Sequence, residues 1–168
     1  MAVDATQDKH ERAVADTFRE WYNSRHGTAY GFYARGADSP DFVYRDGDRE
    51  MLLEVTAAYY DANNATMLWQ IARGVPGAAQ DWMGKDPDNM LVDSVSAILQ
   101  KKCGRPYPKG CVLLVVLYPD ITSADEFEDL RTEIKIPPTS SFAEIYVAGM
   151  FPASSGGCRG GYYCWKLA

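Results

Sequence analysis

The sequence predicts a single α/β domain, a mixed central sheet flanked by helices, and three observations lead to that expectation. The chain has 168 residues, 46% hydrophobic and 24% charged, which suffices for one core and is too short for two full domains. Stretches with helical periodicity alternate with short stretches typical of strands. One of them, Cys111 to Leu117, is a continuous apolar run, as expected for a strand covered on both faces.

The N-terminal part of the chain predicts a helix and then three strands. The predicted elements are a helix at 7–25, a strand at 28–33, and a hairpin with strands at 41–45 and 50–57. Val14, Phe18 and Trp21 recur at helical spacing in the first of these. The segment Asp46-Gly47-Asp48 supplies the positive φ that a tight hairpin turn needs.

The remainder of the chain predicts helices that alternate with strands. The predicted elements are a helix at 61–73, a loop at 74–87 that contains Trp82, a helix at 88–103, a strand at 111–119, a helix from 122–125 through Ile134, and strands at 142–147 and 162–167. Leu91, Val95 and Leu99 form an apolar stripe on the helix at 88–103. Neither GxGxxG nor GxxxxGK[ST] follows a strand, which excludes Rossmann and P-loop folds.

The charge balance limits the partners that the whole molecule can attract. Seventeen Lys and Arg residues against twenty-three Asp and Glu residues give a net charge of −6, which repels polyanions. Any nucleic-acid contact must therefore be local, with Arg105, Lys109 and Arg159 near predicted loops as candidates, or be aided by a delivering protein partner. The N-terminus lacks an apolar signal segment, and no stretch reaches the length of a membrane span. We therefore expect a cytoplasmic protein without membrane contact.

Two acidic residues stand on the predicted hairpin. Asp41 opens the first strand and Glu54 lies thirteen residues later in the second. Strand alternation places Glu54 and Thr56 on one face, and an ionised carboxylate inside an apolar strand is costly unless it meets a cation or several donors. Two hard oxygen ligands on adjacent strands could hold Mg²⁺ or Mn²⁺.

This pattern resembles the PD-(D/E)xK nuclease superfamily, which has the restriction-endonuclease-like fold. The resemblance rests on Pro40-Asp41, on Glu54-Val55-Thr56 and on the order of elements over a core of about residues 7–119, to which 122–167 add a C-terminal helix and strands. It implies that the two acids hold a divalent metal ion, that a lysine positions or activates the attacking water, and that a glutamate on the first helix completes the site. The implied activity is metal-dependent phosphodiester hydrolysis of DNA or RNA.

The lysine of the motif is the point at which the sequence departs from the family. Thr56 stands in its place, and in some branches a lysine reaches the same space from the next helix. With Val95 at zero and 100° per residue, Lys102 falls at about 340°, inside the apolar stripe, and Lys101 at about 240°, outside it. Lys102 is therefore the catalytic candidate. The alternative is that it complements the helix dipole and extends to water.

Glu11 is the acid on the first helix that fits the implied third metal ligand. With Val14 at zero it falls at about 60°, on the side of Phe18, whereas Glu20 falls at about 240°. The alternative is a surface residue that stabilises the helix N-terminus. Asp41 could likewise be an ordinary loop residue, and Glu54 the partner of a basic side chain.

Other functions remain open on the sequence alone. The missing strand lysine favours a catalytically inactive domain of the same fold that binds protein or nucleic acid. An acyl-transfer enzyme using Cys103 or Cys111 has little support, since no His accompanies either thiol. Tyr59 and Tyr60 are expected to pack the hairpin onto the next helix, with base stacking as the alternative.

Residues outside the motif receive structural roles. The four cysteines are expected to be free thiols, with zinc binding at Cys158 and Cys164 as the lesser alternative. His10 and His26 are expected at the surface, and Trp82 stays without an assigned role.

Overall fold

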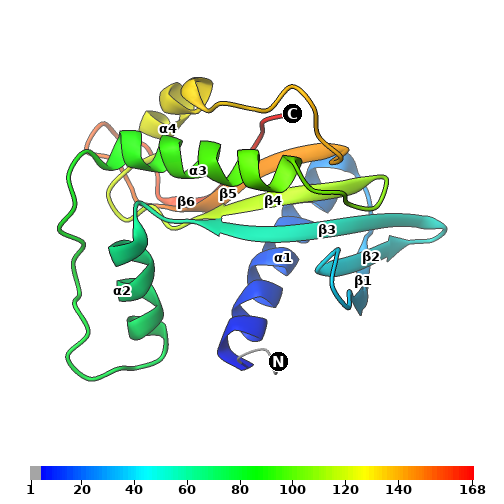
Figure 1. The fold of residues 1–168 in the computed structure, drawn as a ribbon, viewed down its shortest axis with the longest axis horizontal. Coiled ribbons are helices and arrows are strands. Elements are labelled where there is room, and N and C mark those ends of the chain that lie inside the picture. Colours follow the sequence, from blue (N-terminus) through cyan, green and yellow to red (C-terminus); the bar gives the residue numbers. More distant parts are fainter. Residues whose placement is uncertain (1–4) are drawn as a thin grey trace.

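A computed structural model describes residues 5–168 and contains one mixed sheet between helices (Figure 1). The helices are α1 (Ala5–His26), α2 (Ala62–Ala72), α3 (Pro87–Cys103) and α4 (Ala124–Leu130), with a 3-10 turn, η1, at Arg131–Glu133. The strands are β1 (Gly31–Arg35), β2 (Phe42–Asp46), β3 (Arg49–Ala58), β4 (Cys111–Leu117), β5 (Glu144–Phe151) and β6 (Gly161–Lys166). The predicted α/β class with helices on both faces is confirmed.

The six strands lie in the sheet in their order along the chain, from β1 to β6. The β1–β2, β2–β3 and β5–β6 pairs are antiparallel, whereas β3–β4 and β4–β5 are parallel. The turn between β2 and β3 consists of Gly47 and Asp48, and Gly47 has φ +60, a conformation that glycine adopts without strain. The predicted hairpin is therefore confirmed.

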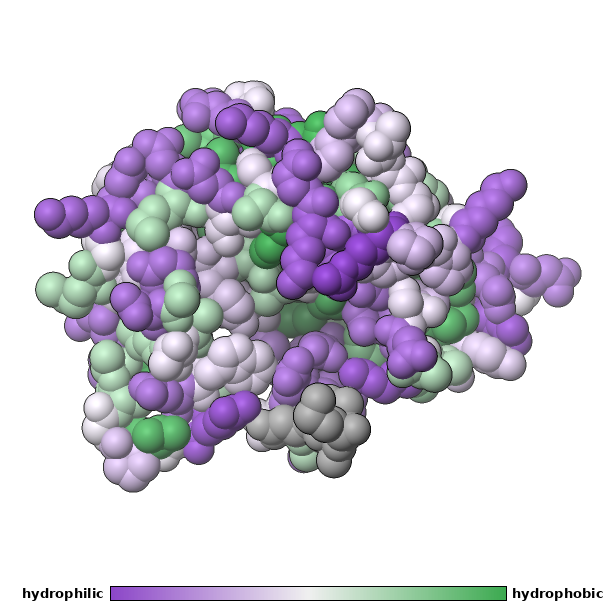
Figure 2. Space-filling model, in the orientation of Figure 1, coloured by the Kyte–Doolittle hydropathy of each residue, from purple (hydrophilic) through white to green (hydrophobic). Residues whose placement is uncertain are grey.

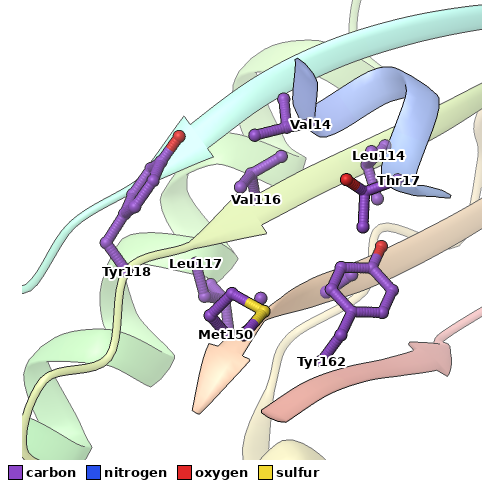
Figure 3. A pocket seen from close by; sticks show the side chains of 10 residues that line it. Val14, Thr17, Leu114, Val116, Leu117, Tyr118, Met150 and Tyr162 are labelled. Carbon is purple, nitrogen blue, oxygen red and sulfur yellow. The ribbon is translucent and has the colours of Figure 1, made fainter. Parts of the chain in front are cut away.

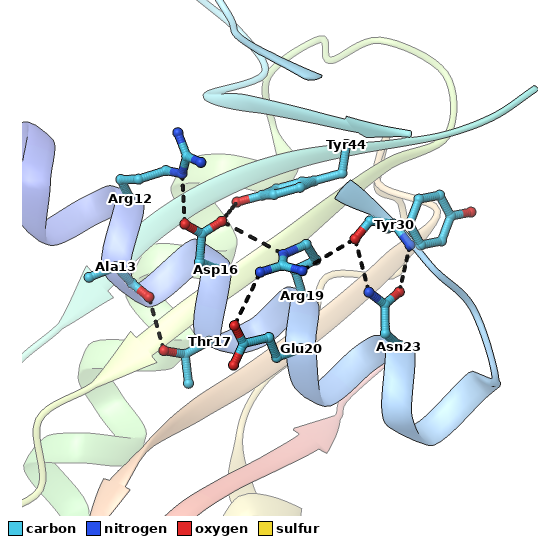
Figure 4. A network of polar contacts seen from close by, with 9 residues as sticks. All are labelled: Arg12, Ala13, Asp16, Thr17, Arg19, Glu20, Asn23, Tyr30 and Tyr44. Atoms are coloured by element: carbon cyan, nitrogen blue, oxygen red, sulfur yellow. Dashed lines mark hydrogen bonds and ion pairs between the residues drawn. The ribbon is translucent and has the colours of Figure 1, made fainter. Parts of the chain in front are cut away.

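Helix α1 covers one face of the sheet, below it in Figure 1. The buried layer there consists of Ala15, Phe18, Phe42, Tyr44, Met51, Leu53, Val112, Leu114, Val116, Tyr146 and Ala148. A polar network fastens α1 to the β1–β2 side (Figure 4). Asp16 accepts hydrogen bonds from Arg12 at 2.8 Å and from the Tyr44 hydroxyl at 3.0 Å. Asn23 exchanges two hydrogen bonds, each 2.9 Å, with the backbone of Tyr30.

The other face is covered mainly by α3 and α4, above the sheet in Figure 1. Leu91, Val95 and Leu99 are buried against it, which confirms the apolar stripe of α3. Since β3 alternates, Leu53 faces α1 while Glu54 faces α3. Both faces of β4 are buried, as its continuous apolar sequence predicted.

Several boundaries differ from prediction, and at one of them a side chain bonds the backbone. The strand expected at 28–33 begins at Gly31, because Asn23 binds the backbone of Tyr30. The helix expected to reach Ile134 ends at Leu130 and continues as η1. The strand expected to end at residue 147 continues to Phe151, which pairs with Gly161.

Trp82 anchors the segment between α2 and α3. Its ring is buried and stacks on Tyr60, with centroids 4.7 Å apart, and its indole N–H donates to Asp61 at 3.0 Å. Asp61 also caps α2 by accepting from the backbone N–H of Asn64 at 2.7 Å. The role that the sequence left unassigned is thus a structural one.

One face of the molecule is largely polar. On the face drawn in Figure 2, hydrophilic residues cover most of the area and hydrophobic residues emerge in small groups. Within residues 5–168, no helix combines the length and apolar character needed to cross a membrane.

Candidate active site

Asp41 stands where β2 begins, at the end of a tight loop. The loop closes through a hydrogen bond of 2.9 Å from the Gly36 N–H to the Asp41 carbonyl. Phe42 pairs with Leu53, and both belong to the core on the α1 side, so Asp41 is level with Glu54 on the α3 side. One Asp41 carboxylate oxygen accepts from the Val55 N–H at 2.8 Å, beyond the last β2–β3 pair. The Asp41 side chain thus accepts a backbone hydrogen bond from β3 at the point where β2 diverges from that strand.

Glu54 is buried, with 6% of its surface exposed, and it meets the cation that the sequence suggested. The Lys102 ammonium lies 2.8 Å from Oε1 of Glu54, and the Ser39 hydroxyl lies 3.4 Å from Oε2. Lys102 belongs to the last turn of α3, one residue before the buried Cys103. Its predicted position beside Glu54 is confirmed, and the contact equally fits the alternative in which Glu54 is the partner of a basic side chain.

The site concentrates negative charge. Burial raises the pKa of Asp41 to about 6, and the charges of Glu54 and Glu11 add to this, although the Val55 N–H and Lys102 act in the opposite direction. Burial alone would lower the pKa of Lys102, but the hydrogen bond and charge of Glu54, with Tyr107, raise it above its ordinary value. Lys102 is therefore an ammonium at neutral pH.

Glu11 approaches from α1 but is held by another partner. The Arg35 guanidinium binds Glu11 at 3.0 Å and Asp8 at 2.7 Å, and the side chain of Gln7 donates to Glu11 at 2.9 Å. Its charge still reaches Asp41 and helps to raise the pKa of that carboxyl. The structure therefore joins Glu54 and Lys102 directly, places Asp41 where the charges of both act on its pKa, and holds Glu11 on Arg35 and Gln7.

The donor set suits a hard divalent cation. Across residues 5–168, no three His, Cys, Asp or Glu side chains gather in a metal-binding group, so the predicted set of Asp41, Glu54 and Glu11 is not assembled as three ligands. Two carboxylates nevertheless suffice for Mg²⁺, which commonly completes its shell with water and phosphate oxygens. The raised pKa of Asp41 marks a place where added positive charge is favourable.

The buried thiol beside the acids does not serve nucleophilic chemistry. Burial, with the charge of Glu54, raises the pKa of Cys111 to about 12, so the thiol stays protonated. His10 is engaged with the Tyr118 hydroxyl and His26 stacks on Tyr22. The four cysteines are free thiols, as predicted.

A cleft of about 240 Å³ opens on the α1 side of the sheet, between α1, β3 and the ends of α2 and β4, and it approaches Asp41 at Val55, whose N–H bonds that carboxylate. Its walls include Glu11, Thr56, Tyr59, Trp69 and Tyr118. Glu11 thus borders both the cleft and Asp41. Thr56, which stands in place of the motif lysine, lines the cleft and can supply a hydroxyl but no charge.

A separate cavity of about 140 Å³ lies between α1 and the ends of β4 and β5 (Figure 3). Val14, Val116 and Tyr118 line both this cavity and the cleft. The described residues around it carry no charge, and in Figure 3 Tyr162 points across it toward Thr17. It therefore offers no charged group, and Asp41, Glu54 and Lys102 are not among the residues that line it.

The candidate basic patch is not assembled. Arg105 and Lys109 belong to the segment between α3 and β4, near the start of β4, whereas Arg159 lies between β5 and β6, where β5 has ended. Since β4 and β5 are parallel, these positions are at opposite ends of the sheet. They do not form a single nucleic-acid contact.

Comparisons of the chain with protein-family models, curated proteins and solved structures found no match. The site must therefore be interpreted from its own geometry. That geometry includes three groups the sequence reasoning missed, namely the Ser39 hydroxyl, the Val55 N–H and the aromatic ring of Tyr107. Ser39 stands two residues before Asp41, so its closeness in sequence could have indicated that it belongs to the site. The position of Tyr107 beside Lys102 depends on the tertiary fold.

Proposed function

We propose that this protein is a metal-dependent phosphodiesterase of the PD-(D/E)xK type that cleaves nucleic acid. The observation that carries the proposal is the buried contact of 2.8 Å between Lys102 and Glu54, on the face that Asp41 shares. This contact supports the proposal that a lysine from α3 supplies the cation that Thr56 cannot. The mixed sheet with a helix before the hairpin and another before β4 agrees with the restriction-endonuclease-like order of elements.

Lys102 would act as a donor of hydrogen bonds and positive charge. An ammonium has three N–H donors, and one of them is directed to Glu54. The others can orient a water molecule or bind a phosphate oxygen as negative charge develops on it. Because Glu54 keeps the ammonium protonated, positioning and charge stabilisation suit Lys102 better than general-base catalysis.

Asp41 and Glu54 would hold the metal ion. When bound, Mg²⁺ or Mn²⁺ supplies Lewis-acid polarisation of the phosphate and lowers the pKa of water. The Val55 N–H fixes the Asp41 carboxylate, and Ser39 with Lys102 fixes that of Glu54. Fixed ligands reduce the reorganisation required during the reaction.

The decisive experiment is a nuclease assay with labelled DNA and RNA, in Mg²⁺ or Mn²⁺ and in EDTA. We expect cleavage with metal and none in EDTA. Lys102→Met keeps an apolar stem and removes the charge, so cleavage should fall by a factor of roughly 10² or more. Lys101→Met is the matched control, since Lys101 is its exposed neighbour on the same helix, and it should retain wild-type activity.

Two results would overturn the proposal. Equal losses in the two lysine variants would show that the ion pair with Glu54 is not part of a catalytic centre. A wild-type protein without cleavage of any substrate, in either metal, would favour the inactive domain that binds protein or nucleic acid.

A further inference from the structure

A stack of aromatic rings borders the cleft beside the candidate active site. Tyr59 and Tyr118 lie nearly parallel, with centroids 5.2 Å apart and an interplanar angle of 11°. His10 stacks on Tyr118 at 5.5 Å, and Trp69 meets His10 edge-on at 5.8 Å. The rings come from α1, α2 and the segments after β3 and β4, and all four are only partly buried.

The cleft continues past these rings along α2. The same four aromatic side chains line an adjoining hollow of about 180 Å³. Trp69 and Gln7 also border a further hollow of about 440 Å³, whose wall includes Gln70 and Arg73. The Arg73 guanidinium lies over the Trp69 ring, 5.6 Å from its centroid. The groove thus combines flat rings, amide groups and one cation.

Two residues link the groove to Asp41. Val55 lines the cleft and donates its N–H to the Asp41 carboxylate at 2.8 Å, and Glu11 lines the cleft and acts on Asp41 through its charge. A strand with a phosphodiester at Asp41 could therefore pass the edge of β3 and extend between α1 and α2, which lie on the same side of the sheet in Figure 1. A base of that strand would then meet the aromatic rings.

We infer that this groove binds an unpaired base of a single-stranded nucleic acid, stacked against Trp69 and the Tyr59–Tyr118–His10 rings. The inference rests on the proposed function and names its substrate class. Stacking tolerates any base and needs an open π face, which a base within a duplex does not offer. The net charge of −6 also disfavours the many phosphate contacts that duplex binding requires.

Binding in EDTA tests the inference without cleavage. Fluorescence anisotropy would compare a labelled oligothymidylate, an oligouridylate and a duplex of the same length at low salt. We expect both single strands to bind at least several-fold more tightly than the duplex. Trp69→Leu should weaken single-strand binding by roughly 5-fold or more, and Trp69→Phe, which retains a ring, should weaken it less.

Matched controls separate stacking from damage to the fold. Tyr33→Leu removes an exposed aromatic ring on β1, outside the groove, and should leave binding unchanged. Tyr59→Leu provides a second groove variant if circular dichroism shows that Trp69→Leu does not fold. Equal affinity for single strands and duplex, equal losses for Trp69→Leu and Tyr33→Leu, or no binding at all would overturn the inference. Preferential single-strand binding without cleavage in Mg²⁺ or Mn²⁺ would uphold it and overturn the nuclease proposal alone.

Discussion

Lys102 and Glu54 illustrate how a single buried charge dictates its surroundings. Moving an isolated carboxylate from water into a protein interior costs roughly several kcal/mol of free energy, even after the protein has relaxed around it. Glu54 meets this cost with an ammonium at 2.8 Å and a hydroxyl at 3.4 Å. A hydrophobic pair of similar volume would serve stability equally well or better. Two buried charges at this position are therefore not required for stability.

Asp41 is predicted to destabilise the metal-free protein at neutral pH. Its pKa is about 6 in the folded protein and 3.8 ordinarily, chiefly because of burial. The folded state therefore binds more protons than the unfolded state between these values, so stability falls as the pH rises from about 4 to 6. Asp41→Asn keeps an oxygen for the Val55 N–H and removes the charge, and in EDTA it should stabilise the protein by about 1 to 2 kcal/mol at pH 7.5.

Urea unfolding of both proteins from pH 4 to 7.5 measures this difference. The stabilisation should be close to zero at the acidic end, grow through pH 6 and then level off. A constant difference across the range, or a variant less stable than wild type at pH 7.5, would contradict the assignment of the raised pKa to Asp41.

At the scale of residues, the sequence allowed the acids and the lysine to be placed, but not their partners. Periodicity assigns Glu54 to a strand face and Lys102 to a helix stripe, and the fold places the two in contact. The partner of Glu11 was not predicted, because a helical wheel gives the direction of a side chain but not the other groups that compete to bind it. Arg35 lies on a strand whose position depends on tertiary packing, and its contact with Glu11 was not predictable from spacing.

At the scale of elements, the loop from Gly36 to Asp41 positions the first acid. A Cβ at Gly36 would lie 1.6 Å from the Pro40 carbonyl oxygen, so a larger residue must displace this backbone. The same glycine donates the hydrogen bond that closes the loop onto Asp41. The orientation of Asp41 toward Val55 thus depends on a residue with no chemistry of its own.

Gly36→Ala should therefore impair the site more than the fold. We expect a loss of about 1 to 3 kcal/mol in the free energy of unfolding, as for overpacking. Nuclease activity should fall by at least about tenfold, since misplaced catalytic groups are costly. Gly31→Ala, at the start of the preceding strand β1, is the control, because its added Cβ would meet nothing within 4 Å. Activity of Gly36→Ala equal to that of Gly31→Ala would show that the loop does not position Asp41.

The elements were more predictable than their ends. The stripe of α3, the Gly47 turn and the apolar run of β4 each contain a local signal, and all three were confirmed. The start of β1 was displaced because the Asn23 side chain forms hydrogen bonds with the backbone of Tyr30. Hydrogen bonds of this kind depend on which elements become neighbours, and the periodicity of the sequence does not contain that information.

At the scale of the whole molecule, divalent ions are predicted to stabilise the fold. A ligand that binds only the folded state raises stability in proportion to the logarithm of its concentration above Kd. Mg²⁺ or Mn²⁺ at saturating concentration should raise Tm by roughly 2 to 4 °C for each kcal/mol gained. Differential scanning fluorimetry provides the measurement, with K⁺ at matched ionic strength as the control.

Glu54→Gln should abolish the metal response, since a neutral amide is a weaker ligand for a hard cation. An identical rise in Tm for wild type and for Glu54→Gln would place the ion elsewhere. No rise for wild type would indicate that the two carboxylates do not bind a metal, and would favour the inactive domain.

The order of the strands bears on how the molecule is assembled during synthesis. Because each strand lies beside the one before it, every new strand can join the growing edge of the sheet as it leaves the ribosome, without insertion between strands already paired. Asp41, Glu54 and Lys102 all precede β4, so the acids and their lysine have emerged before β5 and β6 are translated. The last two strands then extend the sheet beyond β4, away from a centre whose parts are already present.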